Sequence, residues 1–280
     1  MKPAAFAYAK AHSVDHAIEL LGTPESKLLA GGQSLIATLN MRLANPSLLV
    51  DINDVADLDR IELKNGFVEI GAMVRHAQAE RSDIIANHAP LIALAMPHIA
   101  HAAIRNRGTI GGSLAYADPA AELPACMVAL DAEFDIAGPL GRRSAKAGQF
   151  FKGMFETALG PQDILVAIRV PAATTQTRVG FEELTRRHGD YAIVGLAASA
   201  RAEGAKLGNV RLVYFSVGNA PVRARSAESA LASGNLDEAV AALSNDLAPH
   251  ADLENSSATK LHLAGVLLHR VAKQLQDARG

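Results

Sequence analysis

The stretch SKLLAGGQSLIATLN, residues 26–40, decides how the chain folds. Residues 26–30 predict a buried strand, Gly31-Gly32-Gln33 predicts a turn, and Ser34 can cap a following helix. That helix would place three leucines along its length, Leu35, Leu39 and Leu43. Asn45-Pro46 would end it, and residues 48–52 predict a second strand. The order strand, glycine turn, helix, strand predicts a small βαβ unit.

The hydrophobic period then changes along the chain. Asn65-Gly66 lies between two apolar runs and predicts a hairpin. A helical region and a second glycine turn follow, at residues 76–105 and 109–113. A further helix is predicted at residues 120–130. Strands are predicted after it, at residues 164–170, 179–184, 192–201 and 210–217. The chain then finishes with three predicted helices, at residues 226–232, 236–243 and 258–276.

The Thr- and Ala-rich segment 171–177 predicts a domain boundary. We expect a first domain over residues 1–174. A smaller domain over residues 175–280 would combine a sheet with C-terminal helices. The fold class predicted from these patterns is α+β.

Composition excludes several kinds of protein. Hydrophobic residues make up 49% of the 280 residues, which is enough for a sizeable core. A net charge of −2 argues against general nucleic-acid binding. The single cysteine, Cys126, excludes an internal disulfide and a four-thiolate iron–sulfur cluster. The most apolar stretch, residues 91–104, is too short for a membrane span, and the N-terminus lacks a signal-peptide core, so we expect a cytoplasmic protein.

Paired glycines at 31 and 32 allow a backbone to approach a bulky anion, because no Cβ stands in the way. Consecutive N–H groups, together with Gln33 and Ser34, would supply donors suited to a pyrophosphate. The segment matches neither the dinucleotide fingerprint with three spaced glycines nor a P-loop. Taken alone, it can also be no more than a tight connection between a strand and a helix.

The second glycine segment is RNRGTIGGS, residues 105–113, with hydroxyls at Thr109 and Ser113. Arg105 and Arg107 could neutralise phosphate charge, or could simply be solvated surface residues. Asp118 and Glu122 follow, and carboxylates can accept hydrogen bonds from sugar hydroxyls. Two such segments meeting from opposite sides could hold a long ligand along its phosphate–ribitol chain.

Together the two segments resemble the paired FAD motifs in flavoprotein subunits of molybdenum hydroxylases. The similarity is greatest to the medium subunits of carbon monoxide dehydrogenase and of bacterial N-heteroaromatic hydroxylases such as quinoline oxidoreductase. Further similar stretches extend it over nearly the whole chain, at Lys2-Pro3-Ala4-Ala5-Phe6, Val50-Asp51-Ile52, Gly71-Ala72-Met73, Gly189-Asp190-Tyr191-Ala192 and Gly218-Asn219-Ala220-Pro221-Val222-Arg223.

The resemblance implies the FAD-binding fold of the vanillyl-alcohol oxidase and xanthine dehydrogenase type. That fold has two α+β subdomains, here of about residues 1–57 and 58–174, and is followed by a small C-terminal α+β domain. It implies that the first segment and residues 109–113 wrap the pyrophosphate and ribityl chain. It places Glu122 near the cofactor, Leu165 near the adenine or dimethylbenzene portion, and Tyr191 near the isoalloxazine. The implied cofactor residues are Leu28, Leu29, Ala30, Gly31, Gly32, Gln33, Ser34, Leu35, Thr109, Ile110, Gly111, Gly112, Ser113, Asp118, Glu122, Leu165 and Tyr191.

This chain departs from the family pattern at two positions. Gln33 stands where many relatives have His, and Ser113 where many have Asp or Asn. Both replacements are polar, so they put details of the ribityl contacts in doubt rather than the flavin itself.

The function that the resemblance implies is electron transfer. Substrate would be hydroxylated at a molybdenum–pterin cofactor in a large subunit, and electrons would pass through 2Fe–2S clusters in a small subunit to FAD in this chain. An external acceptor, which could be NAD⁺, a quinone, a protein carrier or oxygen, would then take them. The single cysteine agrees with clusters on another chain. The similarity also favours an N-heteroaromatic substrate for the complex.

Other candidate residues have plainer interpretations. His98 and His101 could share a helix face, but no third metal ligand is evident, and a packed or solvated pair is the better interpretation. No metal site and no acid–base catalytic set is predicted. Cys126 lies in an apolar run typical of a buried structural thiol. Two alternative functions remain: a stand-alone FAD-dependent oxidase or reductase, and a scaffold that binds a nucleotide only for stability.

Overall fold

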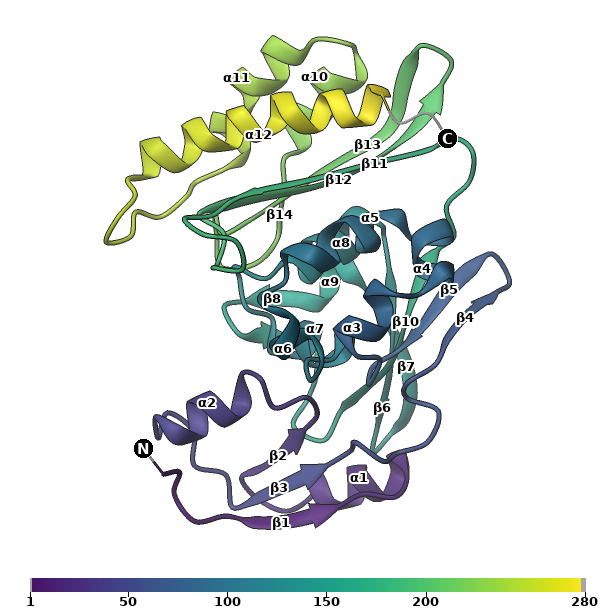
Figure 1. The fold of residues 1–280 in the computed structure, drawn as a ribbon, viewed down its shortest axis with the longest axis vertical. Coiled ribbons are helices and arrows are strands. Elements are labelled where there is room, and N and C mark those ends of the chain that lie inside the picture. Colours follow the sequence, from purple (N-terminus) through teal and green to yellow (C-terminus); the bar gives the residue numbers. More distant parts are fainter. Residues whose placement is uncertain (1, 278–280) are drawn as a thin grey trace.

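The computed structural model describes residues 2–277, and its main sheets follow one another along the long axis of the molecule (Figure 1). The N-terminal sheet is parallel, with strand order β1-β3-β2. Its elements are β1 (Ala7–Lys10), α1 (Val14–Leu21), β2 (Ser26–Leu29), α2 (Leu35–Asn40) and β3 (Leu48–Asp51). Strands β2 and β3 are adjacent and are joined through α2, so the predicted βαβ unit is confirmed.

The middle of the chain builds a five-stranded antiparallel sheet of order β4-β5-β10-β6-β7. Its first elements are β4 (Ile61–Lys64), β5 (Phe67–Gly71), α3 (His76–Glu80), α4 (Asp83–His88), α5 (Pro90–Ala95), the 3₁₀ helix η1 (Met96–His98), α6 (Ala102–Arg105) and α7 (Ile110–Tyr116). The others are α8 (Glu122–Ala129), β6 (Glu133–Gly138), β7 (Gly141–Lys146), α9 (Ala147–Phe150), β8 (Phe151–Gly153), β9 (Glu156–Thr157) and β10 (Ile164–Pro171). Asn65-Gly66 joins β4 and β5, as predicted for a hairpin.

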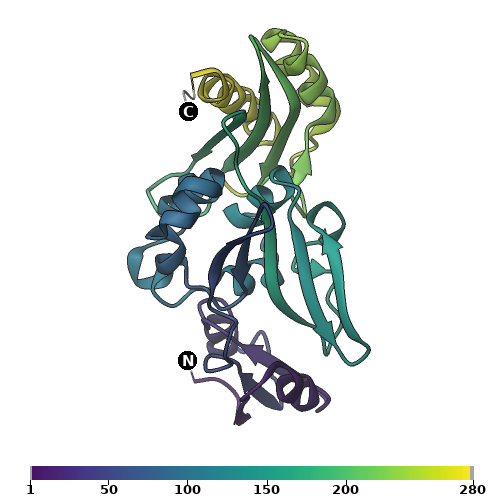
Figure 2. The ribbon, with the colours of Figure 1, turned by 90° about the vertical axis from the view of Figure 1, so that its right-hand side faces the viewer.

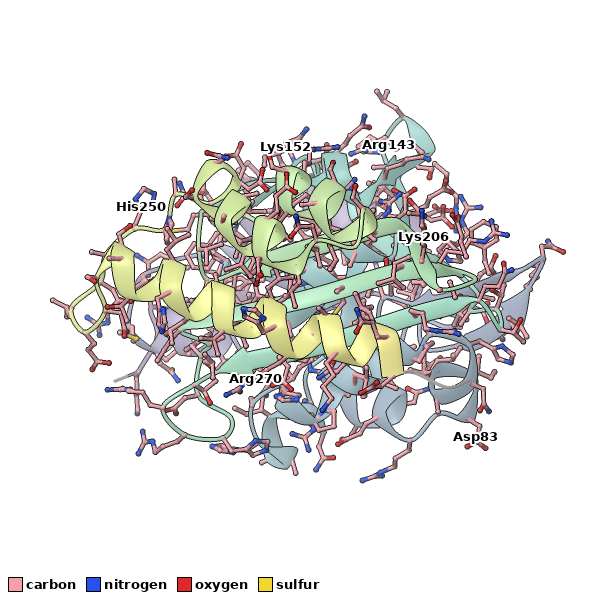
Figure 3. The ribbon with its side chains drawn as sticks, turned by 90° about the horizontal axis from the view of Figure 1, so that it is seen from above. Asp83, Arg143, Lys152, Lys206, His250 and Arg270 are labelled. Carbon is pink, nitrogen blue, oxygen red and sulfur yellow. The ribbon has the colours of Figure 1, made fainter. Side chains whose placement is uncertain are left out.

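The last part of the chain forms a four-stranded antiparallel sheet of order β11-β12-β13-β14. Its elements are β11 (Thr177–Leu184), β12 (Val194–Glu203), β13 (Lys206–Phe215), β14 (Val222–Arg223), α10 (Arg225–Ala232), α11 (Leu236–Asp246) and α12 (Ser257–Asp277). Seen from above, the long helix α12 crosses this sheet, with α10 and α11 beside it (Figure 3). Among the described helices, none combines the length and the apolar character that a membrane crossing requires.

Three local predictions were wrong. Helix α2 ends at Asn40 instead of reaching Leu43, because Arg42 adopts a left-handed conformation (φ 57°). The N–H of Leu43 then bonds the carbonyl of Thr38, which closes the helix in a Schellman motif. The helical region 76–105 is broken into short helices, and Ala100 (φ 46°) separates η1 from α6. The second glycine segment is the first turn of α7 rather than a loop.

The C-terminal sheet is buried on both faces. Alternate residues of β13 point in opposite directions: Leu212 and Tyr214 pack under α10–α12, whereas Val213 and Phe215 join the core around α5 and α8. The turned view shows helices on both sides of this sheet (Figure 2). The segments on either side of the predicted boundary near residue 174 therefore share a hydrophobic cluster. The boundary between two domains at this position stays a prediction.

Phe215 joins the two halves. Its ring stacks on Phe181 with centroids 5.9 Å apart, and both residues belong to the core that also contains α8. Gly195 lies opposite it on β12, and a Cβ there would come within 1.9 Å of the Phe215 ring. The absence of a side chain at Gly195 thus makes room for the aromatic ring that fills the junction.

Truncation of this ring tests the shared core. We expect Phe215→Ala to lower the free energy of unfolding by about 3–5 kcal/mol, since it leaves a cavity between the two halves. Leu140→Ala, at a fully exposed position, is the control and should change stability by less than about 0.5 kcal/mol. Urea denaturation measures both. A loss below about 1 kcal/mol for Phe215→Ala would show that the halves do not depend on this contact.

Candidate functional site

The two glycine segments touch each other through their backbones. A Cβ placed on Gly31 would lie 2.2 Å from the carbonyl oxygen of Arg107 and 3.0 Å from the Cα of Gly108. Any side chain at position 31 would therefore push the segments apart. A Cβ on Gly112 would lie 3.8 Å from the Cβ of Ala30, so the α7 end of the second segment also borders the first. The structure thus brings together two motifs about 75 residues apart.

The first segment presents a row of backbone donors. Within residues 2–277, the N–H groups of residues 31–34 donate no hydrogen bond to a protein acceptor. Gly31 itself is buried, and Gly32 takes a left-handed conformation (φ 73°) that turns the chain. Buried N–H groups almost always have a partner, so the N–H of Gly31 calls for one, and the neighbouring N–H groups, which are more exposed, extend the row of donors that an anion could use. Ser34 occupies the N-cap position of α2, but its side chain makes no capping bond.

The second segment is, by contrast, satisfied internally. Thr109 is buried and caps α7, with its Oγ1 accepting from the N–H of Gly112 at 3.1 Å. The N–H groups of Ile110 and Gly111 bond the carbonyls of Val74 and Ala72. A Cβ on Gly111 would meet the Cα of Ala72 at 2.7 Å. Gly111 therefore serves close packing against the segment after β5, and the anion donors come from the first segment.

The buried side chain of His76 holds the second segment in place through a hydrogen bond. Its Nε2 lies 3.0 Å from the carbonyl oxygen of Thr109, and burial lowers the pKa of His76 to about 4. The ring is therefore neutral at pH 7, and Nε2 carries the proton that it donates to the carbonyl. His76 was not predicted as a site residue, and neither were Arg75 and Asn53, which bridge the two segments. Asn53 could have been noticed, because it follows the carboxyl end of a parallel strand, where ligands commonly bind.

Glu122 lies at the start of α8 and is 9% exposed. Burial raises the pKa of its carboxyl group to about 7, and the nearby Glu183 on β11 raises it further while His98 opposes the shift. Glu183 accepts from Nδ1 of His98 at 3.3 Å, and this bond raises the pKa of His98. Asp118 forms a turn by accepting from the N–H of Ala120. These acids lie where the α7–α8 connection meets the C-terminal sheet.

Tyr191 comes to the same region from the loop between β11 and β12. It is 74% exposed, yet partial burial and the charges of Asp118 and then Tyr116 and Glu122 raise its pKa. Tyr191 therefore lies within electrostatic range of these acids, while most of its side chain faces solvent. Tyr116, which the sequence analysis did not single out, packs on Phe155 with ring centroids 4.9 Å apart.

The remaining predicted residues lie elsewhere or have other partners. Leu165 is buried in β10, within the core of the five-stranded sheet. Arg105 is paired with Glu80 and bonds the carbonyls of Ile99 and Ala100, so it is not available to a phosphate. Arg107 is exposed and has no ion-pair partner among the described residues. His98 and His101 lie on separate elements, not on one helix face.

Comparisons with known proteins agree with this arrangement. Residues 4–173 match the family described as FAD binding domain in molybdopterin dehydrogenase, and residues 180–275 match the CO dehydrogenase flavoprotein C-terminal domain. A curated relative is the 6-hydroxypseudooxynicotine dehydrogenase complex subunit alpha of Paenarthrobacter nicotinovorans, 38% identical over 100% of this chain and 97% of that protein.

Two solved structures are also similar. Carbon monoxide dehydrogenase from Hydrogenophaga pseudoflava superposes with a TM-score of 0.95 at 36% identity, over 98% of each chain. Quinoline 2-oxidoreductase from Pseudomonas putida 86 gives a TM-score of 0.94 at 35% identity, over 100% of each chain.

These matches confirm both the fold class and the resemblance inferred from the two glycine segments. The chain belongs to the family of FAD-binding medium subunits of molybdenum hydroxylases, the oxidoreductases of the carbon monoxide dehydrogenase, xanthine dehydrogenase and quinoline oxidoreductase type.

Proposed function

We propose that this subunit holds FAD across the two glycine segments and carries electrons from iron–sulfur clusters of a partner chain to an external acceptor. The observation that carries the proposal is the row of unpaired N–H groups at residues 31–34, in contact with the second segment at Arg107. A diphosphate supplies the acceptors that these donors lack. Arg107, with no carboxylate partner, would add charge at the same place.

The remaining contacts are assigned by the same proposal. Residues 28–35 and 109–113 would follow the pyrophosphate and ribityl chain. Asp118 and Glu122 would face the sugar-like portion, and Tyr191 would cover the isoalloxazine, which suits its exposed position beside those acids. Leu165 would meet the adenine or dimethylbenzene only through the small exposed part of its side chain, because β10 is paired on both sides, with β5 and with β6. Gln33 donates to the carbonyl of Gly31 at 3.3 Å, so it would shape the segment itself.

When bound, FAD supplies electron transfer that the side chains of this protein cannot supply. The chain's own contribution is binding, orientation and the local charge. Its one thiol, Cys126, is fully buried, and burial raises its pKa well above the usual range, so it is neither a cluster ligand nor a redox group here. The 2Fe–2S clusters and the molybdenum–pterin cofactor are therefore proposed on a small and a large partner subunit.

The substrate class and the location are also part of the proposal. An N-heteroaromatic ring is favoured by the likeness to a quinoline oxidoreductase over the full chain. Hydroxylation would take place on the large subunit. We propose that the complex works in the cytoplasm, with no nucleic-acid partner, in keeping with the net charge of −2.

Co-expression with its neighbouring subunits tests the proposed function. We expect a complex that contains flavin, molybdenum and iron, and flavin absorbance that bleaches when an N-heteroaromatic substrate is added without oxygen. The chain purified alone should carry FAD but show no bleaching with that substrate. Substrate turnover by the single chain would instead support a stand-alone flavin enzyme, and a chain that never retains flavin would contradict the proposal.

The close approach at Gly31 gives a second test. Gly31→Ala would force the segments more than about 1 Å apart, and we expect FAD affinity to fall by about a hundredfold because the donors lose their alignment. Gly148→Ala is the matched control: a Cβ there meets no atom within 4 Å, so affinity should stay unchanged. Quenching of flavin fluorescence measures both. Equal affinity in the two variants would place the diphosphate elsewhere.

Glu122 gives the chain a pH dependence. Its carboxyl ionises near its ordinary pKa in the unfolded chain but only at about 7 in the folded chain, so the unionised form stabilises the fold at low pH. That contribution is lost as the pH rises through about 7. The melting temperature of FAD-free Glu122→Gln should therefore exceed that of the wild type by more at pH 8 than at pH 5. A constant difference would show that Glu122 is not buried as an acid.

A further inference from the structure

Arg75 and Asn53 connect the two glycine segments through a chain of hydrogen bonds. One guanidinium nitrogen of Arg75, Nη1, donates to the carbonyl oxygen of Arg107, and the other, Nη2, donates to Oδ1 of Asn53 at 2.6 Å. The amide nitrogen of Asn53 donates to the carbonyl oxygen of Ala30 at 3.0 Å. We call this set the Arg75–Asn53 bridge. It begins on the second segment and ends on the first.

The end of the bridge at Asn53 is anchored to the N-terminal sheet. Oδ1 of Asp51, the last residue of β3, accepts from the backbone N–H of Asn53 at 2.8 Å and from its side-chain amide at 2.6 Å. The other oxygen of Asp51 accepts from the hydroxyl of Tyr8 on β1. The end at Arg75 is anchored as well, because Arg75 and Thr109 form an antiparallel β-bridge. Both ends therefore have fixed positions.

The bridge fixes the direction of an anion donor. A peptide group is planar and trans, so its N–H points opposite to its C=O. When Asn53 holds the carbonyl of Ala30, the N–H of Gly31 is turned away from Asn53 and towards the row of unpaired donors at residues 31–34. On the other segment, Arg75 holds the carbonyl that Gly31 touches. The same pair thus sets the spacing of the segments and the orientation of the first donor.

The charge of Arg75 lies at the same place. Within residues 2–277 no carboxylate forms an ion pair with Arg75, and its partners are neutral carbonyl and amide oxygens. The side chain is only partly exposed, so its charge is less screened than that of a surface arginine. An anion bound by residues 31–34 would feel this charge directly. Arg81, on the same open pocket as Arg75, is exposed and has no role in the bridge.

We propose that Arg75 and Asn53 are positioning residues for the diphosphate of FAD: they hold the two glycine segments at binding distance and aim the Gly31 N–H at the phosphate oxygens. The inference rests on the proposed FAD site and assigns to that site two residues outside both motifs. It also predicts selectivity, because a flavin without a phosphate makes no use of the aligned donors.

Binding measurements on the full-length chain test this inference. We expect Arg75→Gln and Asn53→Ala each to weaken FAD binding about tenfold or more, because the backbone donors would no longer be aligned with the charged diphosphate. Arg75→Lys keeps the charge but lacks the fork that reaches both acceptors, so it should weaken binding while retaining the wild-type salt dependence. Arg75→Gln should reduce that salt dependence. Riboflavin has no phosphate, so its affinities for these variants and for the wild type should agree within about threefold.

Arg81→Gln is the matched control, because it removes the same charge from the same pocket, and its FAD affinity should stay within about twofold of wild type. Asn53→Asp keeps an acceptor for Arg75 but removes the donor to Ala30 and to Asp51 and sets a second carboxylate beside Asp51, so it should weaken FAD binding and also lower the melting temperature. The melting temperature of each FAD-free variant separates positioning from unfolding.

Several results would overturn the inference. One is wild-type FAD affinity in Arg75→Gln and Asn53→Ala. Another is an equal loss of affinity for FAD and for riboflavin. A third is a loss of FAD affinity that occurs only in variants whose melting temperature is also lowered. If the wild-type chain binds no FAD, the proposed function fails, and inorganic pyrophosphate then tests the bridge alone. Equal pyrophosphate affinity in the wild type and both variants would reject the bridge too.

Discussion

The close contact between the Cα of Gly31 and the carbonyl of Arg107 is the constraint on which the site depends. It requires a glycine, because any Cβ would overlap the carbonyl oxygen at 2.2 Å. It is one of the contacts between the N-terminal parallel sheet and the second subdomain, which also share a hydrophobic cluster, and it lies beside the row of backbone donors. Gly111 of α7 has a different task, since it lets that helix lie directly on Ala72. The two motifs look alike in sequence but act differently in the structure.

The acidic side of the site has a separate origin. Glu122 and Glu183 come from α8 and β11, so their proximity depends on the packing of the C-terminal sheet against the helices of the middle sheet. Phe215 and Phe181 fill that same junction. The two sequence regions that match separate family models are therefore joined in the structure, because one face of the C-terminal sheet belongs to the core of the middle sheet. The position of Tyr191 follows from it, because the loop that carries Tyr191 links two strands of that sheet.

Much of this could be predicted from sequence. The βαβ unit, the Asn65-Gly66 hairpin and the C-terminal helices follow from local patterns, and the paired glycine segments indicated the family. The early end of α2 could not be predicted, because Arg42 in a left-handed conformation has no local signal comparable to a glycine. The Arg75–Asn53 bridge was equally hidden. It joins residues 22 positions apart to carbonyls on two further segments, and such contacts exist only after the sheets have assembled. The contacts implied for the cofactor at single positions, such as Leu165, stay predictions.

The unpaired donors at residues 31–34 also bear on how the subunit is produced in a cell. Of these four groups, the N–H of Gly31 is buried, and a buried polar group without a partner lowers the stability of the fold. A ligand that satisfies it stabilises the folded chain, by an amount that grows with the logarithm of the free ligand concentration. With FAD as that ligand, the share of newly made chains that stays folded would depend on the supply of flavin.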